Sequence, residues 1–180
     1  SMLKIMKRGK GVEKLNELMN HMRSKPNSFV RTTFIAGHPG ETVEDHEALC
    51  KYIEEFKFDR ANVFSYSTEE GTTAALSKDM VDQEIIDERA EEIGEIIAQT
   101  TQESLESEIR KTFEVYVDGE SEEHEYLLSA RKTIWAPDID GEIYINDNEL
   151  PENEQIKFGQ IYTVKITELA GDKLLATVIK

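Results

Sequence analysis

The sequence has a single cysteine, Cys50, among its 180 residues. One thiol cannot form an internal disulfide, and such sparse cysteine use is typical of proteins in a reducing cytosol. No apolar run approaches the length of a membrane-spanning helix, and the first residues lack the apolar block of a signal peptide. These absences predict a cytoplasmic protein that does not enter a membrane.

Several common enzyme motifs are also missing. The sequence contains neither a phosphate-binding loop of the Walker type nor a G-x-G-x-x-G dinucleotide motif. His46 and Cys50 are four residues apart on an expected helix, which would suit two metal ligands, but no further ligands are spaced to join them. Cys50 also falls in an apolar stripe, so we interpret it as a small core residue. His38 and His46 flank no convincing serine nucleophile, so linear spacing indicates no nucleophile–base pair.

Acidic residues dominate the charge. The chain has 37 Asp and Glu against 21 Lys and Arg, which gives a net charge of −16. The balance is +5 over residues 1–25, −14 over 26–109 and −7 over 110–180. Such acidity disfavours a general binder of phosphate backbones and leaves room for a basic protein partner. The alternative, from charge alone, is an acidic surface that serves only solubility.

The first 109 residues alternate helical and strand patterns. Periodic apolar residues predict a helix over 12–24, and β-branched and aromatic residues predict strands over 29–36 and 60–66. A capping box at Thr42 begins the helix between these strands, and a long helix is predicted over 82–109. The buried face of the middle helix is expected to hold Val43, Leu49, Cys50, Ile53 and Phe56. Two parallel strands make a poor sheet, so either other chains complete this βαβ unit or it is a fragment of a larger α/β fold, and we favour the fragment.

The pattern changes near Lys111. Five short β-rich runs follow, separated by turns such as Asp118-Gly119 and Asp140-Gly141. Five strands in so few residues predict a small all-β barrel or sandwich, with an OB-like barrel preferred. We therefore predict two domains, residues 1–109 and 110–180.

The loop after the first strand is the most informative stretch for function. Gly37, Gly40 and Glu41 follow the carboxyl end of a parallel strand, just before a helix, where ligands of α/β folds bind. Tyr66 and Ser67 leave the second strand at the same edge. On spacing alone the ordinary interpretation stays open: a tight turn whose Glu41 complements the helix dipole, and a polar exit loop after the second strand.

Several segments in sequence order resemble the radical-SAM methylthiotransferases. The stretch RTTFIAGHPGET at 31–42, with Glu44-Asp45, is similar to that family's RTTFIVGFPGET-x-ED segment. VFSYS at 63–67 and EEGT at 69–72 resemble the next strand and its YSPEEGT exit loop, and KIMKRG at 4–9 resembles the L-K-x-M-x-R-G segment. His38 replaces the usual Phe and Thr68 the usual Pro, both of which leave the loop shape plausible.

The last 70 residues resemble a TRAM domain. Ala130-Arg131 and APDIDG at 136–141 are similar to the APEIDG signature of the branch that modifies small-subunit ribosomal protein twelve. The resemblance covers nearly the whole chain, and it implies the last βα units of a partial radical-SAM barrel followed by a TRAM barrel. It implies a whole enzyme that adds a methylthio group to an aspartate of that basic ribosomal protein, using S-adenosylmethionine and 4Fe-4S clusters.

The resemblance also implies site residues. The positions that match the family's cofactor wall are Arg31, Gly37, Gly40, Glu41, Tyr66 and Ser67. Asp138, Asp140 and Glu142, in the signature loop, are candidates for substrate binding. The family's amino-terminal domain and its Cys-x-x-x-Cys-x-x-Cys loop are missing, and Cys50 cannot replace three cluster ligands. We therefore expect a carboxyl-terminal fragment that binds no cluster, holds no catalytic residue and is inactive alone.

Two rival functions remain. The sister branch of the family modifies adenosine in tRNA, and its TRAM domain is expected to be basic, whereas residues 110–180 carry −7 here. The second rival is a non-enzymatic binding module that uses the acidic barrel alone. A longer reading frame with an upstream three-cysteine motif would exclude this second rival.

Overall fold

The computed structural model describes residues 2–6 and 11–180, which form two compact units that divide between Thr101 and Gln102. The sequence placed the domain boundary later, at 109/110. Residues 7–9 of the KIMKRG segment lie outside the described residues.

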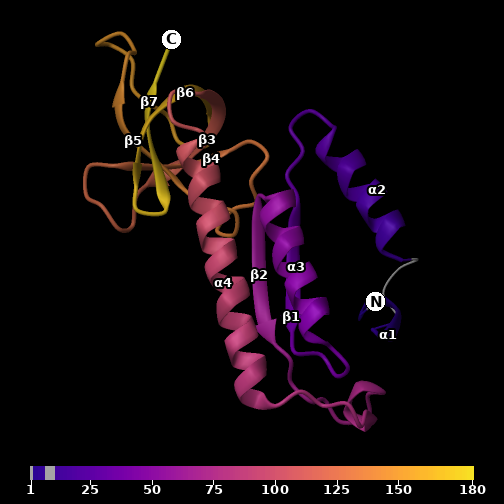
Figure 1. Cartoon of the computed structure of the whole chain (residues 1–180). Coiled ribbons are helices and arrows are strands. Elements are labelled where there is room, and N and C mark those ends of the chain that lie inside the picture. The colour runs from indigo at the N-terminus through magenta and orange to yellow at the C-terminus, as the bar shows by residue number, and fades with distance from the viewer. Residues whose placement is uncertain (1, 7–10) are drawn as a thin grey trace. The chain divides into compact units, whose positions relative to one another are not determined.

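The first unit contains short helices, a pair of strands and most of one long helix (Figure 1). In chain order these are α1 (Met2–Ile5), α2 (Val12–Arg23), β1 (Arg31–Ala36), α3 (Val43–Phe56), β2 (Arg60–Ser65), the 3-10 turn η1 (Ala74–Leu76) and α4 (Gln83–Glu106). Each helix and strand predicted from the sequence is present. The two strands are one or two residues shorter than predicted, and α4 ends three residues early.

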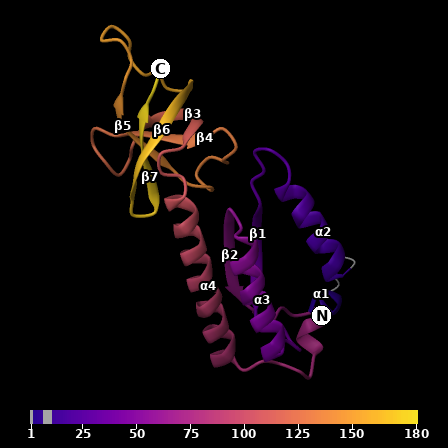
Figure 2. The same cartoon turned by 45° about the horizontal axis from the view of Figure 1, so that its top comes forward.

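β1 and β2 pair in parallel, with Phe34 opposite Val63 and Ile35 opposite Phe64. The helices α3 and α4 lie alongside this pair in both views (Figures 1 and 2). Their contact with one face of the sheet is the core of the unit, built from Ala36, Cys50, Ile53 and Ile93, with Phe34, Leu49, Val63, Ala90, Ile96 and Ile97 packed around it. Of the apolar residues predicted for one face of α3, Leu49, Cys50 and Ile53 therefore pack in this core.

The start of α3 follows the predicted capping box. The hydroxyl of Thr42 accepts a hydrogen bond from the backbone N–H of Asp45 at 3.2 Å, which satisfies one free donor of the first helical turn. The buried residues of α3 are His46, Cys50 and Ile53. Val43 was predicted to be buried, but it is 58% exposed because it stands at the first helical turn, before the helix reaches the sheet.

The opposite face of the β1–β2 pair stays exposed. Ile35 and the adjacent Phe64 have 38% and 62% of their surface exposed in the described structure. A parallel sheet usually has both faces covered, so we expect this apolar face to associate with another surface.

We expect the chain to self-associate through this face at high concentration. Phe64→Ser should lower the average mass measured by light scattering, because it removes the largest exposed apolar side chain of the face. Leu76→Ser is the matched control, since Leu76 is exposed on η1, outside the sheet. A wild-type chain that stays strictly monomeric would contradict this expectation.

The second unit contains a closed five-stranded barrel, as the sequence predicted. Its strands are β3 (Thr112–Glu120), β4 (Leu128–Lys132), β5 (Ile143–Asn148), β6 (Ile161–Ala170) and β7 (Lys173–Val178). They close in the order β3-β4-β5-β7-β6, and only β5 and β7 pair in parallel among these described strands. The alternating inward residues, among them Val115, Val117, Val164 and Ala176, are fully buried. This topology fits an OB-like barrel.

Among the described residues, no helix has both the length and the apolar character needed to cross a membrane.

Candidate functional site

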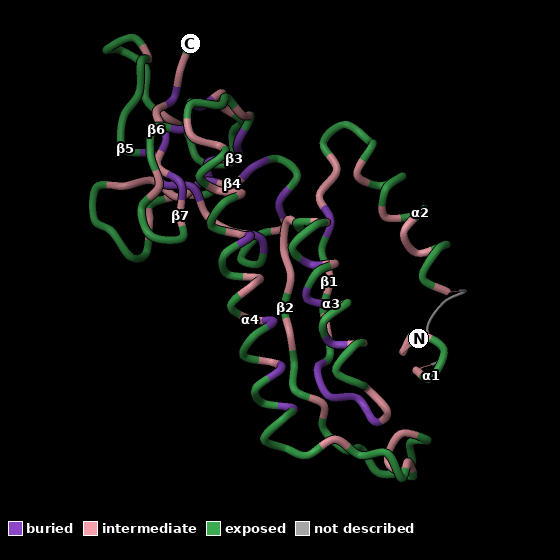
Figure 3. The backbone as a smooth tube through the Cα atoms, viewed as in Figure 1, coloured by how far each residue is buried: buried purple, intermediate pink, exposed green. Residues whose placement is uncertain are grey.

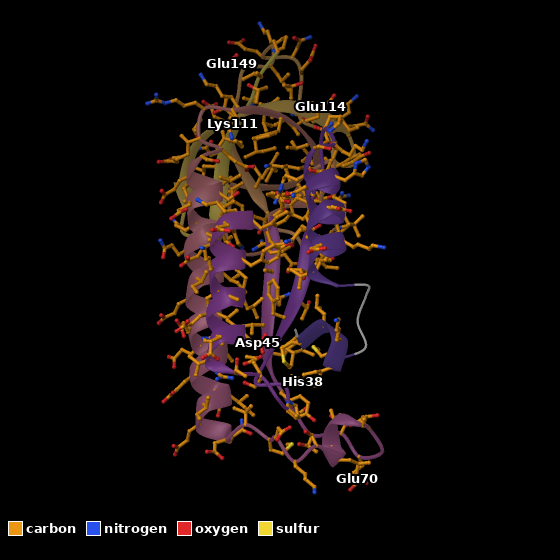
Figure 4. The ribbon with its side chains drawn as sticks, turned by 45° about the vertical axis from the view of Figure 1, so that its right-hand side comes forward. His38, Asp45, Glu70, Lys111, Glu114 and Glu149 are labelled. Atoms are coloured by element: carbon orange, nitrogen blue, oxygen red, sulfur yellow. The ribbon has the colours of Figure 1, made fainter. Side chains whose placement is uncertain are left out.

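The loop that joins β1 to α3 is largely buried. Gly37, His38 and Pro39 are all buried, and Figure 3 shows this stretch as the turn at the end of β1. His38 lies at the same end of the sheet as the start of α3, marked by Asp45 in Figure 4. Its ring nitrogen Nδ1 is 3.0 Å from the carbonyl oxygen of Pro39. The loop is therefore a packed element of the first unit.

Gly37 and Gly40 both have positive φ, of 77° and 82°. A Cβ added to Gly37 would lie 2.3 Å from Cγ1 of Ile86 on α4, closer than any real Cβ contact. At Gly40 the nearest such contact is 3.6 Å, to Cδ1 of Ile5, which is ordinary packing. Glycine at position 37 is therefore required by the close approach of α4, whereas at position 40 it is required by the backbone angle alone.

Glu41 has an internal partner that the sequence did not reveal. Its Oε1 accepts a hydrogen bond from Nη1 of Arg89 at 2.7 Å and another from the backbone N–H of Gly37 at 3.1 Å. Both side chains are buried, with 5% of Glu41 and 10% of Arg89 exposed. Arg89 also donates to the carbonyl of Glu41 at 3.3 Å. This oxygen of Glu41 thus fixes the loop to α4.

Tyr66 lies beside this loop. Its backbone N–H donates to the carbonyl of Ala36 at 2.8 Å, and its ring meets that of His38 edge-on at 5.4 Å between centroids. Its hydroxyl is buried and has no hydrogen-bond partner among the described residues. A buried hydroxyl without a partner costs free energy. Ser67 is exposed and donates to Glu69 at 3.3 Å.

Arg31 does not join the other cofactor-wall candidates. It is the first residue of β1, whereas Gly37 follows the last, so about 20 Å of extended chain separates them. By strand alternation it belongs to the exposed face, with Ile35. The structure therefore brings together five of the six candidates at the carboxyl edge of the sheet.

The three substrate candidates have different environments in the barrel unit. Asp138 is exposed and has a positive φ of 59°. Asp140 is 3% exposed, and its Oδ2 accepts a hydrogen bond from the backbone N–H of Ala136 at 2.6 Å, so it holds its own loop in shape. Glu142 is 2.9 Å from Nζ of Lys173. Only Asp138 of the three presents an exposed side chain.

Lys173 organises a charged cluster that the sequence did not predict. Its Nζ donates to Glu142, to Glu123 at 2.7 Å and to the hydroxyl of Tyr144 at 2.7 Å. Burial alone raises the pKa of Glu142, but hydrogen bonds from Ser129 and Lys173 outweigh it, so the pKa ends below its ordinary 4.5. The pKa of Glu123 is lowered by its hydrogen bonds from Lys173 and Tyr144.

These shifts predict acid sensitivity of the barrel. A carboxyl whose pKa is lowered in the folded state stabilises that state above its unfolded pKa, and the stabilisation is lost as the pH falls through the folded pKa. Lys173→Met should therefore weaken the barrel at neutral pH and flatten its loss of stability below pH 4.5, the ordinary value for Glu142. Urea unfolding followed by the fluorescence of Trp135, the single tryptophan, measures the stability of the barrel at neutral and at acid pH. If the free energy of unfolding falls equally steeply with decreasing pH in the variant and the wild type, the cluster is not the source of the acid sensitivity.

Comparisons with known proteins agree with these two parts. Residues 109–179 match the TRAM domain family. The whole chain is 86% identical to 40% of the ribosomal protein uS12 methylthiotransferase RimO of Aliarcobacter butzleri. It is 56% identical over its full length to the protein of the same name in a Sulfurovum species, and 42% identical to that of Campylobacter jejuni, again covering 40% of each.

The resemblance inferred from the sequence is thereby confirmed, including the branch. The chain spans about 40% of the length of the curated relatives it matches. Over its whole length, the chain is therefore homologous to a portion of the uS12 methylthiotransferases, and that portion contains a TRAM domain.

Proposed function

We propose that this chain is the carboxyl-terminal portion of an enzyme that adds a methylthio group to an aspartate of ribosomal protein uS12. The observation that carries the proposal is the 86% identity over all 180 residues to a protein named for that reaction. At this identity the packed features described above, such as the Glu41–Arg89 pair, are expected in the relative as well.

The first unit is proposed to be the last part of a partial radical-SAM barrel. Its two parallel strands are joined by a crossover helix, and helices cover only one of their faces. The exposed face, with Ile35 and Phe64, would then be covered by the preceding strands of the whole enzyme. This accounts for apolar side chains that are exposed in the chain alone.

The cofactors of the whole enzyme divide between this chain and the rest. S-adenosylmethionine bound to a reduced 4Fe-4S cluster would supply the radical. The residues here do not fit a cluster, which needs three or four thiolates, because Cys50 is buried and is the single cysteine. We propose that Tyr66, whose buried hydroxyl has no partner among the described residues, and the exposed Ser67 would meet S-adenosylmethionine. The Glu41 oxygen that pairs with Arg89 would act by holding the loop in place.

A chimera tests the proposal directly. This chain would replace the matching 40% of the Aliarcobacter butzleri protein, and methylthio-aspartate on uS12 would be measured by mass spectrometry. We expect modified uS12 from the chimera and none from the relative with that portion deleted. A folded, cluster-loaded chimera that leaves uS12 unmodified would overturn the proposal, and methylthio-adenosine in tRNA would assign the chain to the sister branch.

The barrel unit is proposed to contact the ribosomal protein rather than tRNA. Six exposed carboxylates lie within its first strand and the following loop: Glu114, Asp118, Glu120, Glu122, Glu123 and Glu125. Such a surface attracts Lys- and Arg-rich segments and repels a phosphate backbone. Glu114 stands on this unit in Figure 4.

We expect the 180-residue chain to bind uS12 with an affinity that falls as salt is raised, and to bind tRNA weakly. Neutralising three barrel carboxylates should weaken uS12 binding several-fold, since each removes an attractive charge: Glu120→Gln, Glu122→Gln and Glu125→Gln. The matched control removes three exposed carboxylates of α4: Glu84→Gln, Glu88→Gln and Glu95→Gln. Equal weakening by both sets, or tight tRNA binding, would contradict the assignment.

A further inference from the structure

The helices α3 and α4 bring three potential metal ligands together away from the loop described above. His46 and Cys50 lie one turn apart on α3, and Glu92 reaches them from α4. The three ligand atoms all lie within 4.8 Å of one another. The sequence showed only the first two, because Glu92 is 46 residues from His46 along the chain.

The distances favour a shared centre over a proton relay. The Nε2 of His46 is 2.7 Å from Oε2 of Glu92 and 3.6 Å from Sγ of Cys50, whereas that sulfur is 4.0 Å from Nδ1, so both groups lie nearest to the same ring nitrogen. In a catalytic relay the thiol and the carboxylate would contact different nitrogens of the imidazole. Convergence on one nitrogen is the arrangement that a bound cation would accept.

The geometry also suits tetrahedral zinc. With metal–ligand bonds of 2.0–2.3 Å, neighbouring ligand atoms lie roughly 3.3–3.7 Å apart. The contact between Cys50 and His46 already has this length, at 3.6 Å. The contact between His46 and Glu92 is a hydrogen bond, and it would have to open by about 0.6 Å. Glu92 can make this shift because its side chain is 60% exposed, whereas His46 is held in the core at 7%.

We propose that His46, Cys50 and Glu92 form a binding site for Zn²⁺ or a similar borderline-soft divalent cation. Thiolate, imidazole and carboxylate are the donors that zinc accepts, and three of them leave a fourth position for water. Binding would displace the thiol proton of Cys50 to solvent. The exposed Glu92 gives the ion a path from solvent to the buried ligands.

The surrounding charges support the same assignment. Burial, together with the smaller effect of the nearby carboxylates of Glu92, Glu54 and Glu41, raises the pKa of the Cys50 thiol to about 11. The negative potential that disfavours a thiolate here would favour a divalent cation, because the cation neutralises the charges of the thiolate and of the nearby carboxylates. A bound ion would also join α3 to α4 at the edge of the core that contains Cys50 and Ile93.

Cobalt provides a sharp test, since Cys50 is the single cysteine and any thiolate-to-cobalt absorption band must come from it. We expect the 180-residue chain to bind one equivalent of Co²⁺ with such a band, and Zn²⁺ to displace it. Cys50→Ser should abolish the band. Glu92→Gln, at an exposed position that leaves the fold intact, should weaken Co²⁺ binding at least tenfold, whereas its neighbour Glu95→Gln should not. No band at millimolar Co²⁺, or a band that Glu92→Gln leaves unchanged, would overturn the site.

Discussion

Gly37→Ala is expected to destabilise the first unit by about 2–5 kcal/mol. A side chain at φ 77° costs about 1–2 kcal/mol, because an L-residue is strained in the left-handed region. The new Cβ would also meet Ile86 at 2.3 Å, and overpacking of this kind costs about 1–3 kcal/mol. Ile86 is 3% exposed on α4, so it cannot move aside without shifting the helix.

Gly40→Ala separates the two costs. Gly40 belongs to the same loop and has nearly the same φ, but an added Cβ there meets only ordinary contact with Ile5. We therefore expect it to cost the strain alone, about 1–2 kcal/mol. Urea unfolding followed by far-UV circular dichroism reports the helices, while Trp135 fluorescence reports the barrel unit. Equal losses in the two variants would show that α4 does not press on Gly37.

The loop shows which part of the site the sequence could predict. The cap at Thr42 follows from residues three apart, and the structure has it. The sequence identified Gly37 as a loop residue at the edge where ligands of α/β folds bind. The structure gives it a positive φ, and the side chain that approaches its backbone is Ile86, 49 residues away. Contacts across such separations depend on how α4 packs, which local patterns do not contain.

The barrel was predictable because its signals are local. Strands such as β3 and β7 alternate inward and outward residues, and a glycine-containing turn lies between β6 and β7, so these short strands are marked by their own sequence. The roles of single carboxylates were not predictable in the same way. Asp140 and Glu142 are two residues apart in the signature loop. Asp140 accepts a hydrogen bond from the backbone of its own loop, whereas Glu142 pairs with Lys173 on β7.

The buried pair of Glu41 and Arg89 is expected to give the second large effect. Arg89→Met should destabilise the first unit by about 3–5 kcal/mol, because it leaves the Glu41 carboxylate in the interior without its cation. Glu41→Gln should cost a similar amount, since the arginine is then buried beside a neutral group. The Lys51–Glu55 pair is the matched control: both side chains are about two-thirds exposed or more, and Glu55→Gln should change stability by less than about 1 kcal/mol.

A double-mutant cycle decides whether the pair acts as a unit. If each charge is buried only because the other is present, the variant with both Glu41→Gln and Arg89→Met should lose clearly less than the two single losses added together. The hydrogen bond from the Gly37 N–H to Glu41 predicts that the loop also loosens in each single variant, which faster amide exchange at Gly37 and its neighbours would register. Strictly additive losses, with exchange at Gly37 unchanged, would mean that the loop is held by the packing of Ile86 and that the ion pair contributes nothing to its shape.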